Sequence, residues 1–113
     1  MENQRKAKRY HLVHYLQIFE RETDKLLGNM VDITPHGIKL ISDKEIPENT
    51  SLALRMEFPE KVLGTNLLDF DAKSVWCKPD TNNPDLFAIG IEHHNITKLD
   101  VQVIEHIIQM YED

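Results

Sequence analysis

Hydrophobic and polar residues alternate in short segments along most of the chain, as is typical of strands with one buried face. The clearest case is the segment 51–58, where Leu52, Leu54, Met56 and Phe58 share one face. Turn-forming residues separate the segments, and no helical pattern interrupts them. The predicted strands cover residues 10–19, 28–33, 37–42, 51–58, 67–77 and 86–92.

The alternation also assigns a face to the single tryptophan of the chain. In the segment 67–77, Leu68, Phe70, Ala72 and Trp76 fall on one side. The pattern therefore predicts that the indole lies on the same side of the sheet as three apolar residues.

The period changes near the C-terminus, where residues 97–111 are predicted to form one helix. Thr97 is placed to cap its first turn, and Asp100, three residues later, completes a weak capping box. We expect the apolar side of this helix to pack against the strands, with a partner protein as the alternative contact. Its apolar stripe consists of Val103, Ile104, Ile107, Ile108 and Tyr111.

Strands that follow one another without helices between them favour antiparallel pairing. We therefore predict a mainly β fold, a six-stranded antiparallel β-barrel with a C-terminal α-helix. Closure into a barrel removes the exposed edges that an open sheet would leave. Residues 10–113 are expected to form this domain, and residues 1–9 a flexible basic arm in front of it.

Charge is unevenly distributed along the chain. The formal net charge is −6, and residues 1–9 hold four basic side chains and one acidic one, which gives 4 − 1 = +3. The other residues therefore carry −6 − 3 = −9. An acidic body repels phosphates, which argues against duplex nucleic acid as a partner and leaves a small anionic ligand open.

Three features bear on the location of the protein. No apolar run approaches the roughly 20 residues of a membrane span. The charged N-terminus lacks the pattern of a signal peptide. Cys77 is the only cysteine, so the chain forms no internal disulfide, as is usual in a reducing compartment. We therefore expect a cytoplasmic protein.

The basic arm contains two arginines four positions apart. The guanidinium groups of Arg5 and Arg9 are planar forks that match phosphate oxygens and the O6/N7 edge of guanine, which lysine cannot do. A solvated basic tail is the alternative interpretation of this segment.

The turn DITPHG, residues 32–37, carries more polar chemistry than a hairpin needs. An ionised Asp32 only accepts hydrogen bonds, which suits the N1–H and N2–H₂ donors of guanine. Thr34 adds a hydroxyl, and Gly37 permits a positive φ and a close approach of a ligand to the backbone. The alternative is a turn whose polar groups satisfy one another, with Pro35 for rigidity.

Together, RKAKR and DITPHG resemble the R-x-x-x-R and (D/N)-x-S-x-x-G signature of PilZ domains, which are bacterial receptors for cyclic di-GMP. The segments VWCKP and FAIGIEHH, and the helix after NIT, follow in the order found in that family. The resemblance covers nearly the whole chain. It implies a six-stranded antiparallel barrel with the arm folding over one of its faces.

The resemblance also implies roles for individual residues. Arg5 and Arg9 match the motif arginines, which bind the phosphates and the Hoogsteen edges of the guanines. Asp32 matches the acidic position that holds guanine N1 and N2. Thr34 replaces the usual serine, with a hydroxyl whose rotamer is restricted by β-branching, and Gly37 matches the motif glycine.

Three further residues are candidate ligand contacts: Gln4, His36 and Trp76. Gln4 occupies a position at which many members carry another arginine, a feature associated with two stacked ligand molecules. Because glutamine lacks a cationic plane, we expect one ligand molecule per chain. Trp76 lies on a strand that can border the ligand in such domains, with a buried structural role as the alternative.

Other residue clusters do not favour metal binding or catalysis. His11 and His14 fall on opposite faces of a strand, and the adjacent His93 and His94 diverge, so neither pair predicts a metal site. Cys77 has no evident base beside it. We expect no cofactor, no metal and no enzymatic activity.

The expected function is that of a stand-alone cyclic di-GMP receptor that acts as an adaptor. Residues 1–9 would be mobile without ligand and ordered across the barrel with it, a change that an effector protein can read. Two other functions stay open. One is a nucleotide-independent PilZ-like interaction module, and the other is a small barrel that binds single-stranded nucleic acid.

Overall fold

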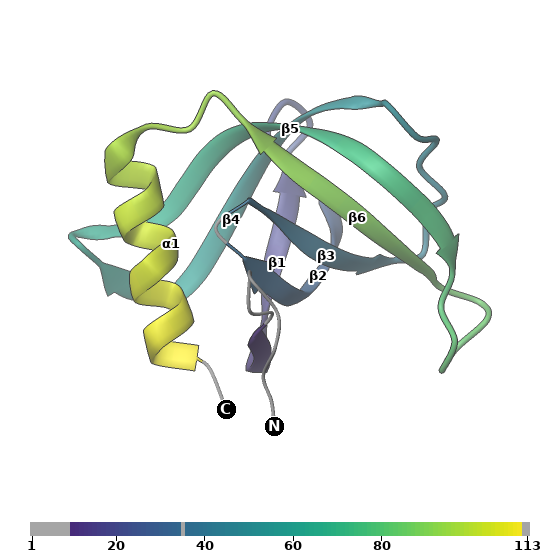
Figure 1. The fold of residues 1–113 in the computed structure, drawn as a ribbon, viewed down its shortest axis with the longest axis horizontal. Coiled ribbons are helices and arrows are strands. Elements are labelled where there is room, and N and C mark those ends of the chain that lie inside the picture. Colours follow the sequence, from purple (N-terminus) through teal and green to yellow (C-terminus); the bar gives the residue numbers. More distant parts are fainter. Residues whose placement is uncertain (1–9, 35, 112–113) are drawn as a thin grey trace.

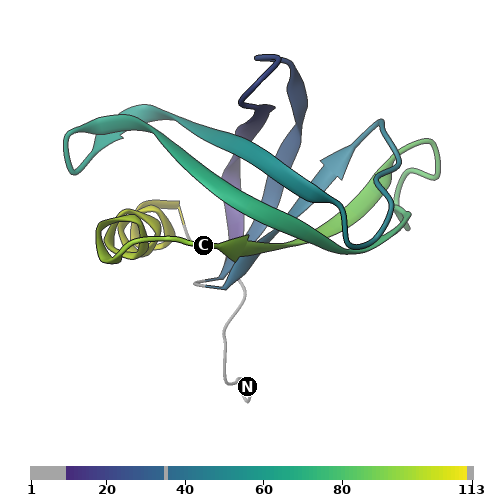
Figure 2. The ribbon, with the colours of Figure 1, turned by 90° about the horizontal axis from the view of Figure 1, so that it is seen from above.

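The computed structural model describes residues 10–34 and 36–111, and this part of the chain contains a closed barrel of six antiparallel strands (Figure 1, Figure 2). Around the barrel the strands run β1-β2-β3-β6-β5-β4. The predicted mainly β barrel with a C-terminal helix is confirmed. The predicted arm, with Gln4, Arg5 and Arg9, lies outside the described residues. The elements are β1 (Tyr10–Glu20), β2 (Leu26–Thr34), β3 (Gly37–Ser42), β4 (Ser51–Val62), β5 (Thr65–Pro79), β6 (Phe87–His94) and α1 (Lys98–Tyr111).

Alternating side chains of the strands fill the barrel interior. In β4 the predicted inward face is confirmed, because Leu54, Met56 and Phe58 are buried and Leu52 packs against them partly buried. Every second residue of β3 is buried in the same way. An interior filled by apolar side chains leaves the outer face of the sheet as the place for a ligand.

The β4–β5 hairpin is longer than the sequence pattern predicts. The pattern ends one strand at residue 58 and begins the next at residue 67, whereas β4 and β5 reach Val62 and Thr65. Leu63 and Gly64 form a two-residue turn between them, with φ angles of 51° and 85°. A turn with positive φ at both positions follows the twist of the strands, so pairing continues up to the turn.

A β-bulge in β2 changes the face on which the following residues lie. The pairing of β2 with β3 skips Val31, which is an extra residue between Met30 and Asp32. One extra residue shifts the alternation by one position. Ile33 therefore enters the core, where it is fully buried, and Asp32 before it turns to the outer face.

A second bulge, in β5, determines the position of the tryptophan. Val75 is an extra residue between Ser74, which is fully buried, and Trp76, which pairs with Gly90. Because the bulge shifts the alternation, Trp76 moves to the outer face, and Cys77 after it packs against the core instead. The prediction that Trp76 shares a face with the apolar residues earlier in its strand is wrong.

The helix α1 begins with the predicted capping box. The backbone N–H of Asp100 donates to the Thr97 hydroxyl at 3.1 Å, and the backbone N–H of Thr97 donates to Asp100 Oδ2 at 3.0 Å. The helix packs against β1, β2 and β4 on one side of the barrel (Figure 1). The side chain of Tyr111 lies outside the described residues. The other members of the predicted stripe are buried, namely Val103, Ile104, Ile107 and Ile108. In the described part of the chain, no helix has both the length and the apolar character to cross a membrane.

Candidate ligand-binding site

Asp32 and Trp76 lie at the two ends of one row of residues that crosses four neighbouring strands. Asp32 on β2 pairs with Lys39 on β3. Lys39 pairs with Gly90 on β6, and Gly90 pairs with Trp76 on β5. The row spans three interstrand spacings, or about 14 Å. The two bulges bring both end residues to the outer face, so the row forms one continuous surface.

A second row runs beside the first, nearer to the β2–β3 turn. Thr34 pairs with Gly37, Gly37 with Glu92, and Glu92 with Lys73. A Cβ at Gly37 would collide with the carbonyl oxygen of Ile91 on the neighbouring strand. The φ angle of Gly37 is not in the left-handed region. The glycine is therefore required by the close approach of β6, and not by the positive φ that the sequence suggests.

The Thr34 hydroxyl organises the β2–β3 turn. Its oxygen accepts hydrogen bonds from the backbone N–H groups of His36 and Gly37, both at 3.2 Å. Its O–H donates to the carbonyl oxygen of Gly37 at 3.4 Å. These bonds support the interpretation of a turn that satisfies its own polar groups. Thr34 therefore shapes the site through the backbone of the turn.

The indole of Trp76 lies on Gly90. A Cβ at position 90 would collide with the indole atoms Nε1, Cε2 and Cδ1. The Nζ atom of Lys78 lies 5.3 Å from the ring centroid, within the range of a cation–π interaction. The glycine thus makes room for a large aromatic plane on the outer face, and such a plane can stack on a flat base.

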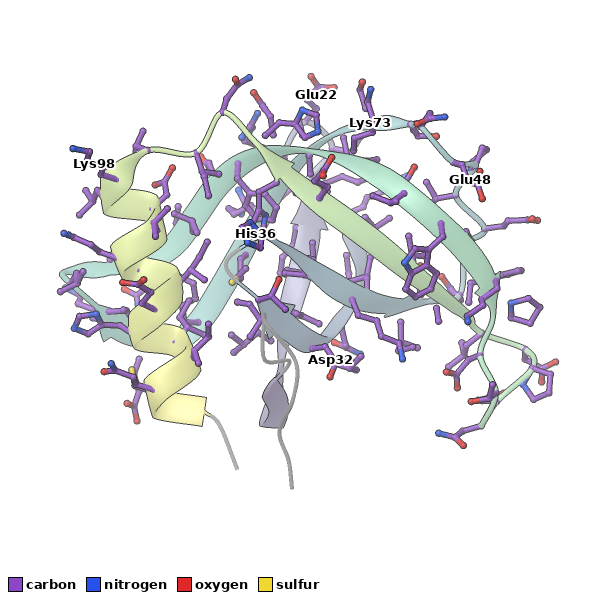
Figure 3. All side chains as sticks on the ribbon, viewed as in Figure 1. Glu22, Asp32, His36, Glu48, Lys73 and Lys98 are labelled. Carbon is purple, nitrogen blue, oxygen red and sulfur yellow. The ribbon has the colours of Figure 1, made fainter. Side chains whose placement is uncertain are left out.

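The two rows border a pocket of about 210 Å³ on the outer face of β2, β3, β5 and β6. Asp32 is 3% exposed there, whereas His36 is exposed. Figure 3 shows both of these residues on the side of the barrel that β2 and β3 form. The pocket brings together the predicted site residues that the structure describes, namely Asp32, Thr34, His36, Gly37 and Trp76.

Sequence reasoning missed several residues that line this pocket. Lys39 could have been found, because it lies two positions after Gly37 on the same strand and so shares its face. Gly90 and Glu92 are distant from the turn in the sequence, and only the pairing of β3 with β6 brings them to it. Val75 reaches the pocket because it is the bulged residue of β5.

His93 connects the β2–β3 turn to β6. Its backbone N–H donates to the carbonyl oxygen of His36 at 3.0 Å, and its ring meets Phe70 edge-to-face at 5.1 Å. Burial, and to a smaller extent the nearby His36, lower the pKa of His93 to about 4, while Asp100 opposes this shift. Among the described residues, neither ring nitrogen has a hydrogen-bond partner. His93 is therefore neutral at pH 7.

The histidines of the described segments do not gather into a metal site. His94 Nε2 lies 3.3 Å from Glu92 Oε1, while the adjacent His93 ring packs on Phe70. Within residues 10–34 and 36–111, no group of three or more His, Cys, Asp or Glu side chains is placed to hold a metal ion.

The family model described as PilZ domain matches residues 3–110 of the chain. No curated protein matches the chain.

Solved structures share the fold. The inhibitor of motility MotI/DgrA from Bacillus subtilis has a TM-score of 0.74 at 18% identity, over 96% of this chain and 51% of that chain. The PilZ domain of YcgR from Escherichia coli with c-di-GMP has a TM-score of 0.67 at 15% identity, over 96% of this chain and 92% of that chain. The complex of MrkH from K. pneumoniae with c-di-GMP has a TM-score of 0.65 at 13% identity, over 96% of this chain and 52% of that chain. The chain thus spans about half the length of the Bacillus and Klebsiella proteins.

Proposed function

Because the chain belongs to the PilZ domain family, we propose that it is a receptor for cyclic di-GMP and binds it in the pocket between Asp32 and Trp76. The observation that carries the proposal is that two β-bulges turn a carboxylate and an aromatic plane toward one pocket. The related domains of YcgR and MrkH were solved with this ligand, which supports the same use of the fold here.

Asp32 is the residue that reads a guanine base in this proposal. Its carboxylate accepts hydrogen bonds, and guanine offers two parallel donors at N1 and N2. Asp32 as a whole residue is 3% exposed, so these bonds form away from bulk water, where a hydrogen bond to a charged group is stronger. Adenine, which presents an acceptor at N1, loses one of the two bonds.

Lys39 supplies positive charge on the barrel itself. It pairs with Asp32 across the strands and lines the pocket. Two carboxylates, those of Asp32 and Glu92, also line the pocket, so a ligand with two phosphates needs cations to bind there. Lys39 contacts one phosphate, and Arg5 and Arg9 of the arm, which lie outside the described residues, complete the phosphate contacts.

The arm also provides the signal. Its net charge of +3 attracts the anionic ligand, which draws residues 1–9 across the outer face of the barrel. This ordering changes the shape and charge of the surface, and an effector protein in the bacterial cytoplasm reads the change. Since Gln4 stands where another arginine would stack on a second ligand, one cyclic di-GMP molecule binds per chain.

Titration calorimetry with cyclic di-GMP, cyclic di-AMP and GTP tests the proposal. We expect one cyclic di-GMP per chain with a dissociation constant on the order of 1 μM, and weaker binding of the other two nucleotides. Asp32→Asn should remove the preference for guanine. Glu48→Gln changes charge by the same amount on an exposed loop and should bind like the wild type (Figure 3). If the wild type does not bind cyclic di-GMP, the chain is a nucleotide-independent interaction module.

A further inference from the structure

A second carboxylate, Glu92, lines the same pocket. Glu92 lies on the outer face of β6, where it pairs with Gly37, and its side chain is 60% exposed. Among the described residues, its carboxylate contacts the ring of His94, whose Nε2 lies 3.3 Å from Glu92 Oε1. A carboxylate beside a ligand with two phosphates weakens binding unless it meets hydrogen-bond donors on that ligand. The position of Glu92 therefore favours a contact between its carboxylate and hydrogen-bond donors of the ligand.

Glu92 is close to the aromatic plane of the pocket. It lies two residues after Gly90 on the same face of β6, and the Trp76 indole lies on Gly90. Glu92 is two residues from Gly90 along the strand, or about 6.7 Å, whereas Asp32 is two interstrand spacings from Gly90, or about 10 Å. A base stacked on the indole over Gly90 is therefore closer to Glu92 than to Asp32.

We propose that Trp76 and Glu92 form a second guanine subsite, in which one base of the ligand lies on the indole and donates its N1–H and N2–H to the Glu92 carboxylate. This inference rests on the proposed function of the pocket. Asp32 reads one guanine and Glu92 reads the other. The protein then prefers a ligand with two guanines over a cyclic dinucleotide with one guanine and one adenine, because adenine cannot donate two parallel bonds to a carboxylate.

The surroundings of the indole allow a base to reach it. The ammonium group of Lys78 lies 5.3 Å from the Trp76 ring centroid, and the Lys78 side chain is exposed. A base that stacks on the ring displaces only this flexible side chain, which then lies next to the phosphates. The indole atoms Nε1, Cε2 and Cδ1 lie next to Gly90, so a base approaches the ring from the side on which Lys78 lies.

The test compares Glu92→Gln with the charge-matched control Glu48→Gln, each titrated with cyclic di-GMP and with 3′,3′-cyclic GMP–AMP. Glutamine keeps the shape of the side chain but places an N–H₂ group against the guanine donors. We expect the wild type to prefer cyclic di-GMP by about 10-fold or more. Glu92→Gln should lose about 10-fold in affinity for cyclic di-GMP and little for the mixed nucleotide, so that the preference disappears. Glu48→Gln should keep the wild-type preference.

The outcomes separate this inference from the proposed function. If Glu92→Gln binds both nucleotides more tightly, Glu92 only repels phosphates and the second subsite is wrong, while the receptor function stands. An equal loss for both nucleotides, or no loss, also overturns the subsite alone. If the wild type binds neither nucleotide, the proposed function fails and the subsite with it. A second readout is the emission of Trp76, the only tryptophan, which a stacked guanine should quench in the wild type.

Discussion

Gly90 and Trp76 are cross-strand neighbours, and the indole occupies the space that a side chain at position 90 would fill. The bulge at Val75 turns the tryptophan outward, and the absence of a Cβ on β6 lets its ring lie close to the sheet. The pair therefore creates a fixed aromatic plane at one end of the row that begins at Asp32. A fixed plane binds a base with less loss of side-chain freedom than a mobile one.

We expect Gly90→Ala to displace the indole and to weaken cyclic di-GMP binding by about 1–3 kcal/mol, the usual contribution of one base stacked on an aromatic side chain. Titration calorimetry measures the affinity, and the emission maximum of Trp76 reports the displacement. Gly64→Ala is the matched control, because Gly64 has a φ of 85° at a hairpin turn and a Cβ there would meet no other atom. The control should lower stability by about 1 kcal/mol and leave the affinity unchanged. Normal binding by Gly90→Ala would contradict the role of the Trp76 plane.

Thr34→Ala should loosen the β2–β3 turn. The hydroxyl accepts from two backbone N–H groups, those of His36 and Gly37, and alanine leaves both without this partner. We expect the free energy of unfolding to fall by about 1–2 kcal/mol, measured by chemical denaturation. The affinity for cyclic di-GMP should fall as well, because the turn borders the pocket. Thr34→Ser keeps the hydroxyl and should restore most of both quantities. If Thr34→Ser loses as much stability and affinity as Thr34→Ala, the methyl group of Thr34 and not its hydroxyl supports the turn.

Arg5→Ala and Arg9→Ala should each weaken cyclic di-GMP binding by about 1–3 kcal/mol, the contribution of a bidentate arginine contact, without lowering the melting temperature of the ligand-free protein. Arg5→Lys should recover little of the affinity that Arg5→Ala loses, since lysine keeps the charge but lacks the planar guanidinium fork. Lys6→Ala removes the same charge from the arm and serves as the control. If Lys6→Ala loses as much affinity for cyclic di-GMP as the two arginine variants, the charge of the arm alone attracts the ligand.

The neutral His93 makes stability depend on pH. Its pKa falls from 6.5 to about 4 on folding, so the unfolded chain binds more protons between these values. Its contribution to stability is complete above pH 6.5 and is lost as the pH falls toward 4, by an amount on the order of 3 kcal/mol. Denaturation at several pH values should show a shallower acid-side loss for His93→Phe than for the wild type. Phenylalanine keeps an edge-to-face contact with Phe70. If the stability of His93→Phe and of the wild type depends on pH in the same way, carboxyl groups and not His93 cause the loss of stability in acid.

The local elements of this protein follow from the sequence alone. Alternation with a period of two predicted the strands, and the three-residue spacing of Thr97 and Asp100 predicted the capped start of α1. The turn from Asp32 to Gly37 was evident from its polar residues. Each of these features depends on the backbone geometry of a few consecutive residues, so a short stretch of sequence is enough to specify it.

The composition of the pocket depended on the tertiary structure. The extra residues Val31 and Val75 are ordinary strand-forming residues, so the sequence pattern does not mark them as bulges, yet each one moves the residue after it to the outer face. Trp76 was consequently assigned to the wrong face. Gly90 and Glu92 reach the β2–β3 turn only because β3 pairs with β6 and not with the strand that follows it in the chain. Strand register and bulges result from the best packing of the whole barrel, and this packing decides which distant residues share a site.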